Sequence, residues 1–287
     1  MTTDLEPLAD ACIAMPYARA IGLAVSTLEP GLVRLRLPYR DENGNRNGTL
    51  HGGVLAGLVD TAGALAAATG LPPGDAATTD LVVHYLAAAH GEEVVAEARV
   101  RRAGRAIAFV SVDVTSAAGT LVATGLVARR TGGTSASDAD PVPSPLDGIS
   151  DDELRSAQGS GSPFTSRLGV VFAKQEAGRA VVLLPFSPEF TDGADRLHEG
   201  TLAALTDCAG GVAAWSVHGF DLRSWAATIG MHLSFGALPR GEGAVAVSTV
   251  PFRAGSLFVN DVAIVSRESS RPIATGSVTY RIVPRAG

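Results

Sequence analysis

The chain has 287 residues, of which 46% are hydrophobic and 18% are charged, and its net charge of −6 includes no Lys- or Arg-rich run. This composition predicts a globular chain, one large domain or two ordinary ones, and argues against disorder and against a nucleic-acid partner. The two cysteines, Cys12 and Cys208, form no disulfide or metal-ligand pattern. We therefore expect buried thiols in a reducing cytoplasm, no metal and no cofactor.

A membrane-spanning segment is not expected. The N-terminus carries no basic region followed by an apolar run, so it does not have the pattern of a signal peptide. The apolar stretch 54–68 is too short to span a bilayer and contains Asp60. A helix that is apolar all round can instead be one wrapped by protein.

The first half of the chain predicts an α+β unit. A leading helix over 3–15 should end at Pro16, because the residue before a proline leaves the helical region. An Asn/Gly-rich loop over 41–48 should precede a helix from His51 to Thr69. Strands are expected on both sides of that helix, over 21–28, 31–38, 77–86, 93–102, 106–115 and 121–130. Two strands, one helix and four strands predict an antiparallel sheet with a central helix.

The second half repeats the first. Residues 16–68 align without gaps to 163–215, an offset of 147, and 18 of 53 positions are identical. Between the copies lies a Ser/Gly/Pro/Asp-rich segment, with one helical turn expected over 150–157. The sequence therefore predicts two tandem domains, 1–132 and 163–287, joined by a flexible linker, 133–162. Two joined copies should pack as a pseudo-symmetric pair that replaces a homodimer.

Each copy places a carboxylate inside its apolar helix, Asp60 in the first and Asp207 in the second. A charged Asp in such a helix is costly unless it has a partner, and a duplicated one favours a functional role. His51 and Asp60 are nine residues apart, about 900° of helical turn and roughly 13 Å of rise, so they lie on opposite faces. If both residues are functional, Asp60 must meet the second helix start and Asp207 the first. The sequence thus predicts two composite sites between the halves.

The helix start itself has features of a site. Gly52 and Gly53 follow His51, where the first backbone N–H groups of a helix have no intrahelical partner. Such donors at a positive helix end suit a carbonyl oxygen that becomes negative, and glycine lets a ligand approach closely. The alternative is that the two glycines only make a tight turn, and that His51 and Asn45 are capping and turn residues.

Together these residues resemble the hotdog-fold acyl-CoA thioesterases of the phenylacetate-degradation type. The family signature is an Asn, a His-Gly-Gly six residues later, an Asp nine residues after the His, and a strand with Thr or Ser. Asn45, His51-Gly52-Gly53, Asp60 and Thr78 match it. The resemblance covers both halves and implies two hotdog domains in tandem, each an antiparallel sheet wrapped around a central helix.

The resemblance also implies roles in thioester hydrolysis. The N–H after the His would polarise the carbonyl, and the Asp of the other repeat would act as general base or as nucleophile. The better site would combine Asn45, His51 and Gly52 with Asp207 and Thr228. The second copy departs from the signature at Asp192 and Glu199, so the other site is doubtful. It would combine Asp192, His198 and Glu199 with Asp60 and Thr78.

Substrate binding is assigned more broadly. Gly53 and Gly200 are expected near the substrate, and Arg46 and Arg196, with Arg102 and Arg105 as further candidates, near the CoA phosphates. Trp215 and Trp225 either limit the depth of the acyl pocket or belong to the core. Two other functions stay open, a non-catalytic acyl-CoA-binding protein and a hotdog enoyl-CoA hydratase or dehydratase. We also expect the double-hotdog chains to form a homo-oligomer.

Overall fold

The computed structural model describes residues 5–72, 74, 76–131, 139–157, 159, 161–221 and 223–284. Its first half holds three helices and six strands, α1 (Glu6–Ala14), α2 (Pro16–Ile21), β1 (Ala24–Glu29), β2 (Leu32–Leu37), α3 (Gly52–Ala68), β3 (Ala76–Tyr85), β4 (Val94–Ala103), β5 (Ile107–Ser116) and β6 (Leu121–Thr131). Its second half repeats this order after a short helix, α4 (Asp151–Ser156), α5 (Pro163–Arg167), β7 (Val171–Glu176), β8 (Arg179–Leu184), α6 (Glu199–His218), β9 (Ser224–Phe235), β10 (Ala244–Ala254), β11 (Leu257–Ser266) and β12 (Pro272–Pro284). Short 3₁₀ turns lie at Asp41–Asn43 and Pro188–Phe190.

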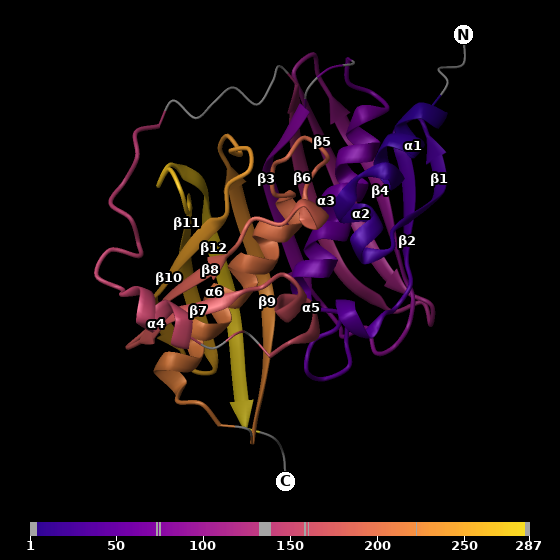
Figure 1. Cartoon of the computed structure of the whole chain (residues 1–287). Helices are drawn as coiled ribbons and strands as arrows, with labels where there is room; N and C mark the ends of the chain where they lie inside the picture. Colours follow the sequence, from indigo (N-terminus) through magenta and orange to yellow (C-terminus); the bar gives the residue numbers. More distant parts are fainter. Residues whose placement is uncertain are drawn as a thin grey trace.

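All twelve strands form one antiparallel sheet, in the order β1-β2-β4-β5-β6-β3-β9-β12-β11-β10-β8-β7. The two halves join where β3 pairs with β9, with Leu81 opposite Leu233 and Val83 opposite Met231. The order reads the same from both edges toward this seam, so the halves are related by a pseudo-twofold axis (Figure 1). The predicted α+β fold with two antiparallel units is confirmed.

The two central helices, α3 and α6, pack against each other and against their own halves of the sheet (Figure 1). This explains why both are largely apolar on every side, since both are mostly buried and only the C-terminal end of α6, at Val217, is exposed. Glycine is needed where they cross, because a Cβ on Gly53 would lie 2.4 Å from the Cα of Ala204, and one on Gly200 would lie 2.6 Å from the Cα of Gly57. The close crossing brings each helix start near the middle of the other helix.

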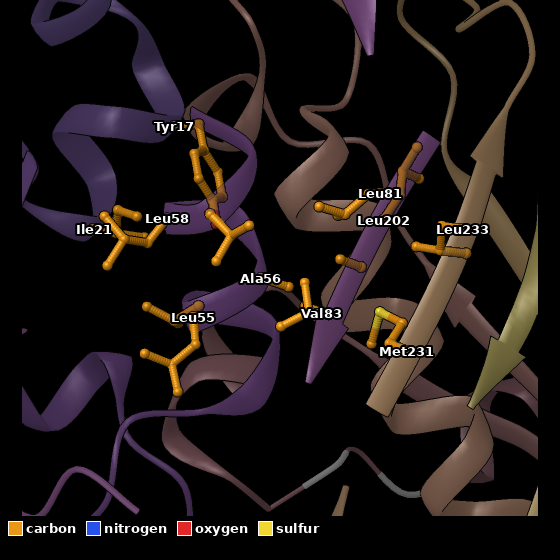
Figure 2. Close-up of a cluster of buried hydrophobic side chains, with 14 of the residues drawn as sticks. Tyr17, Ile21, Leu55, Ala56, Leu58, Leu81, Val83, Leu202, Met231 and Leu233 are labelled. Atoms are coloured by element: carbon orange, nitrogen blue, oxygen red, sulfur yellow. The ribbon is translucent and has the colours of Figure 1, made fainter. Parts of the chain in front are cut away.

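The core continues through the seam. Figure 2 shows Leu55 and Leu58 of α3 and Leu81 and Val83 of β3 in one cluster with Met231 and Leu233 of β9. Tyr17 of α2 is fully buried in the same cluster. Because this core crosses from one repeat to the other, it fixes the positions of the two helices relative to each other.

Some local predictions differ from the structure. Pro16 follows the end of α1 as expected, but it also begins a second helix, α2, because the fixed φ of proline suits a first helical turn. Gly22, in the left-handed region at φ 83°, ends α2, so β1 starts at Ala24 and not at residue 21. Pro163 begins α5 in the same way. The sequence analysis missed both of these short helices.

The predicted linker is more than a flexible spacer where it is described. Ser150 and Glu153 form a capping box that starts α4, as the expected helical turn requires. Leu146 and Ile149 pack against a small cluster on β8, β10 and β11. Residues 132–138 lie outside the described part of the chain, so the boundaries at 132 and 163 stay predictions. No helix in the described ranges is long and apolar enough to cross a membrane.

Candidate active sites at the crossing of the central helices

A histidine caps the first turn of each central helix. His51 Nδ1 accepts a hydrogen bond from the Gly53 N–H at 3.0 Å, and His198 Nδ1 accepts one from Gly200 N–H at 2.9 Å. A neutral imidazole that accepts at Nδ1 carries its proton on Nε2. Burial lowers the pKa of both rings, so both are neutral near pH 7.

Each histidine faces the aspartate of the other repeat. His51 Nδ1 lies 3.5 Å from Asp207 Oδ2, and His198 Nε2 lies 3.9 Å from Asp60 Oδ2. Each histidine is therefore close to the aspartate of the other repeat, as the helical period predicts. We call the group of His51, Gly52, Asp207 and Thr228 site A, and the group of His198, Glu199, Asp60 and Thr78 site B.

A threonine orients the aspartate in both sites. The Thr78 hydroxyl donates to Asp60 Oδ1 at 2.6 Å, and the Thr228 hydroxyl donates to Asp207 Oδ1. In each case one carboxylate oxygen is fixed and the other faces the helix start of the other repeat. In both halves the threonine therefore hydrogen-bonds the aspartate of its own repeat.

The sites differ at the first residue of the helix. A Cβ on Gly52 would lie 2.8 Å from Asp207 Oδ2, so in site A the carboxylate stands against a bare Cα. Site B has Glu199 at this position. Asp60 is fully buried there, and its Oδ2 has no hydrogen-bond partner in the described chain. Burial, followed by the charge of Glu199, raises the pKa of Asp60 to about 7.

Two further pairs of site residues were missed from the sequence. The Tyr17 ring stacks on the His198 ring with centroids 4.1 Å apart, whereas Phe164, its counterpart at the offset of 147, lies tilted at 5.7 Å from His51. An alignment at 147 pairs these residues, but it cannot show that each lies against the histidine of the other repeat.

The second pair lies on the strands opposite the threonines. Arg129 is the β-sheet partner of Thr78, and Tyr280 is the partner of Thr228. The Arg129 Nη1 donates to Thr78 Oγ1 at 3.2 Å and its Nη2 donates to the Ala76 carbonyl at 2.8 Å. Site B thus gains both a carboxylate and a guanidinium relative to site A. The later repeat offset, Ala123-Thr-Gly125 to Ala274-Thr-Gly276, could have revealed this pair.

Asn45 and Asp192 are used locally. The Asn45 Oδ1 accepts from the N–H groups of Asn47 and Thr49, and its Nδ2 donates to Thr49 Oγ1 at 2.7 Å. The structure therefore gives Asn45 a turn role, and no hydrogen bond in the described chain joins it to Asp207. Asp192 forms an ion pair of 2.6 Å with Arg196. Both contacts are local, and Asp192 also lines the cavity beside site B, so the grouping of Asn45 and Asp192 with the two sites stays a prediction.

The residues proposed for substrate binding are also placed. Gly53 and Gly200 pack into the helix crossing, which accounts for the glycines without a ligand. Arg46 is exposed and donates to the Gly161 carbonyl at 3.0 Å, and Arg102 and Arg105 are exposed as well. Trp215 packs beside Ala214, Phe258 and Ile282, and Trp225 is 47% exposed, so neither lines the cavity described next.

A cavity of about 250 Å³ opens beside site B. Its polar lining comes from Arg129, Arg196, His198, Glu199 and Asp192, with Thr61. Its apolar walls come from α1 and the following residue, from α3, from β3 and from Leu238, namely Leu8, Ala11, Cys12, Met15, Ala64, Leu65, Ala68, Ala76, Ala77 and Leu238. Burial raises the pKa of the Cys12 thiol to about 11, in keeping with an unreactive wall residue.

Site B also brings three metal-ligating side chains together. One atom each from Asp60, His198 and Glu199 lies within 4.8 Å of the others. The protonation of His198 does not suit a metal, because its Nδ1 accepts from Gly200 N–H and its proton is therefore on Nε2, which faces Asp60. The donor set fits a metal in distance but not in protonation.

Comparison with known proteins identifies the fold first. The structure of acyl-CoA thioesterase II TesB2 from Mycobacterium marinum aligns with a TM-score of 0.64 and 16% identity, over 94% of this chain and 99% of that one. The structure of a protein of unknown function with a hot dog fold from Alicyclobacillus acidocaldarius aligns with a TM-score of 0.65 and 15% identity, over 94% of this chain and 98% of that one. The chain has the hotdog fold over nearly its whole length, as two units in tandem.

The sequence then gives the family. The thioesterase superfamily matches residues 47–123, which contain the start of α3 and Asp60. Acyl-coenzyme A thioesterase 13 of Homo sapiens is 32% identical over 139 residues, 46% of this chain and 99% of the relative. Its Mus musculus counterpart is 34% identical over 98 residues, which cover 33% of this chain and 70% of the relative. The chain belongs to the thioesterase superfamily and is a thioesterase.

Proposed function

We propose that the protein hydrolyses acyl-CoA thioesters at site A, between the two repeats. The observation that carries the proposal is the meeting of His51 and Gly52 of one repeat with Asp207 of the other, at 3.5 Å between His51 Nδ1 and Asp207 Oδ2. The name of the human relative, acyl-coenzyme A thioesterase 13, supports acyl-CoA as the substrate.

The start of α3 would stabilise the negative oxygen that forms in the reaction. The Gly52 N–H is among the first donors of the helix, which have no intrahelical partner. Its position at the positive helix end suits a thioester carbonyl whose oxygen gains charge in the transition state. Glycine at this position lets the carbonyl approach the backbone, and His51 fixes the first turn by accepting from Gly53.

Asp207 would act from the opposite side of the carbonyl. Thr228 holds its Oδ1, which leaves Oδ2 toward the helix start. As a base, Asp207 takes a proton from water, the water oxygen bonds to the acyl carbon, and the sulfur leaves with that proton. As a nucleophile, its oxygen bonds to the acyl carbon and the C–S bond breaks to release the thiolate. Water then opens the acyl anhydride to the free acid and the Asp207 carboxylate. Single turnover in ¹⁸O-water separates the two, because only the nucleophile acquires label in the Asp207 carboxylate.

The test of the proposal is substitution of Asp207. We expect Asp207→Ala and Asp207→Asn to lower hydrolysis across a panel of acyl-CoAs. A matched control is Asp113→Asn, because Asp113 also accepts from a threonine, Thr124 at 2.7 Å, but on the exposed face of the sheet. Unchanged hydrolysis in both Asp207 variants would place the reaction elsewhere. Acyl-CoA binding without turnover would indicate a non-catalytic acyl-CoA-binding protein. Loss of the conjugated absorbance of an enoyl-CoA would indicate a hydratase or dehydratase.

Other expectations stay predictions. Homo-oligomers of the double-hotdog chain can be tested by light scattering, and the cytoplasmic location by fractionation. Arg46 and Arg196 stay candidates for CoA phosphates, although Arg196 is already paired with Asp192.

A further inference from the structure

We propose that site B is a second hydrolytic site, in which the Glu199 carboxylate meets the substrate in place of Asp60, and in which the neighbouring cavity takes an apolar acyl group. The proposal rests on the thioesterase function proposed above. It assigns a catalytic side chain at a position where site A has only glycine.

Glu199 occupies the place that the aspartate takes in site A. There the Asp207 carboxylate stands 2.8 Å from where a Cβ on Gly52 would lie. By the pseudo-twofold relation, the Glu199 side chain extends from its helix start toward Asp60. Asp60 is fully buried and does not line the cavity, whereas Glu199 does. Glu199 is therefore the carboxylate that a substrate in the cavity meets first.

The Glu199 carboxylate has no partner to hold it in a structural role. Glu199 is only 7% exposed, yet no hydrogen bond or ion pair within the described chain engages its carboxylate. A buried carboxylate without a partner is costly unless water or a ligand satisfies it. The cavity beside it supplies that space.

Charged and aromatic groups from several elements surround the Glu199 carboxylate. Glu199 lies close to Asp60, and Arg129 of β6, where site A has Tyr280, adds a positive charge to site B through its hydrogen bond to Thr78. At the N-cap of α6, the Nε2 of His198 faces Asp60, and from α2 the Tyr17 ring stacks on the His198 ring. The nearby Asp192 and Arg196 neutralise each other. Glu199, which lines the cavity, is therefore the carboxylate placed to act on a water beside the substrate.

The cavity indicates the acyl class. Its walls from α1, β3 and Leu238 are hydrocarbon, its polar lining is Thr61, Arg129, Asp192, Arg196, His198 and Glu199, and its volume of about 250 Å³ is smaller than that of a pocket for a whole ligand, about 300–1,000 Å³. It suits an uncharged acyl chain with the CoA part outside. The wall from α1 belongs to site B alone, because α1 packs on α3 while α4 packs on β7.

The reaction balances without a cofactor. Glu199 takes a proton from water, the water oxygen bonds to the acyl carbon, and the C–S bond breaks. The sulfur leaves as a thiol with the proton from Glu199, and the acyl group leaves as a carboxylic acid. The N–H of Glu199, at the start of α6, faces the carbonyl oxygen as the Gly52 N–H does in site A.

The experiment uses the full chain with Asp207→Asn, so that only site B can act. We expect residual hydrolysis of apolar straight-chain acyl-CoAs. Adding Glu199→Gln should lower kcat by roughly a hundredfold. Adding Asp60→Asn should lower it only several-fold, because Asp60 acts through Glu199.

Each outcome decides one question. If Asp60→Asn removes the residual rate and Glu199→Gln spares it, Asp60 is the base and the proposal is wrong. If Asp207→Asn alone removes all hydrolysis of an active wild type, site B is inactive and the proposed function stands. If the wild type itself hydrolyses no acyl-CoA, the proposed function fails.

The acyl cavity has a test of its own. In the Asp207→Asn background, Ala64→Phe should raise KM for long acyl chains more than for short ones, because it fills the wall at α3. Leu8→Phe does the same from α1 if Ala64→Phe fails to fold. Equal KM changes for all chain lengths in the folded variant would overturn the acyl assignment.

Discussion

Sites A and B begin from the same repeated stretch and end as different chemical environments. Both have a capping histidine, a crossed aspartate and a threonine that holds it. Site A then has Gly52 and Tyr280, and site B has Glu199 and Arg129. Two changes of opposite charge separate them.

The difference shows that a side chain at the first residue of the helix can change which carboxylate faces the substrate. At Gly52 the backbone is bare, and Asp207 reaches the helix start with 9% of its surface exposed. At Glu199 a side chain fills that place, and Asp60 is left with no exposed surface. The fold is the same in both halves, so function is decided by the side chains at one helix start.

The largest expected effect comes from moving the site B residue into site A. With Glu199→Gln silencing site B, Gly52→Glu should lower acyl-CoA hydrolysis by about 10²–10³-fold, the range for losing oxyanion stabilisation. The added carboxylate would stand beside Asp207 and the forming oxyanion, and site A has Tyr280 where site B has the positive charge of Arg129. Gly52→Ala is the control, since its Cβ meets only the movable end of Asp207, and it should cost less. Full activity in Gly52→Glu would show that the residue at this helix start does not distinguish site A from site B.

The next effect tests the crossing on which both sites depend. Gly53→Ala should destabilise the protein by about 1–3 kcal/mol, because its Cβ would lie 2.4 Å from the Ala204 backbone. Gly70→Ala is the matched control, since its Cβ would meet Ala103 at an ordinary 3.6 Å. Urea unfolding of both variants measures the difference. Equal stabilities would show that the helices can separate freely.

A smaller effect should appear in the pH dependence of stability. The folded-state pKa of Asp60, about 7, lies above its ordinary value of 3.8. Between pH 3.8 and 7 the folded chain therefore keeps a proton on Asp60 that the unfolded chain releases. Its favourable contribution is complete below about pH 4 and is lost as the pH rises toward 7. The stability of the wild type relative to Asp60→Asn should fall by about 1–2 kcal/mol from pH 5 to 8.

Denaturant unfolding at both pH values measures this change. The lowered pKa values of His51 and His198 act in the other direction, reducing stability as the pH falls below 6.5, but they are common to both chains. Asp113→Asn, on the exposed sheet face, is the control. A difference that stays constant between pH 5 and 8 contradicts the burial argument.

The smallest effect concerns the threonines. With site B silenced by Glu199→Gln, Thr228→Val should lower kcat roughly five- to tenfold, since it removes one hydrogen bond to Asp207, worth about 1 kcal/mol. Thr228→Ser should restore most of the rate. With site A silenced by Asp207→Asn, Thr78→Val should have a smaller effect, because Asp60 lies behind Glu199. Equal losses at both positions would mean that both aspartates have the same role.

Much of the architecture could be predicted because it depends on local patterns. Strand alternation located β2 to β6 within a few residues, and the repeat offset located the second unit. The helices α2 and α5 were missed because each is a single turn or two that starts at a proline, too short for a periodic signal. The role of Asn45 could not be decided from the sequence, because an Asn in an Asn/Gly loop can bond its own turn as readily as a partner.

The sequence by itself determined the duplication, the hotdog fold and the crossing of each histidine with the aspartate of the other repeat. The repeat offset gave the duplication, and the resemblance to a known family implied the hotdog fold. The crossing follows because the helical period of 3.6 residues places His51 and Asp60 on opposite faces of one helix. Only the tertiary structure decided that Glu199 lines the cavity while Asp60 lies behind it, and that Arg129 and Tyr17 complete site B. Those neighbours come from strands and helices far apart in the chain, and their distances depend on how closely α3 and α6 cross.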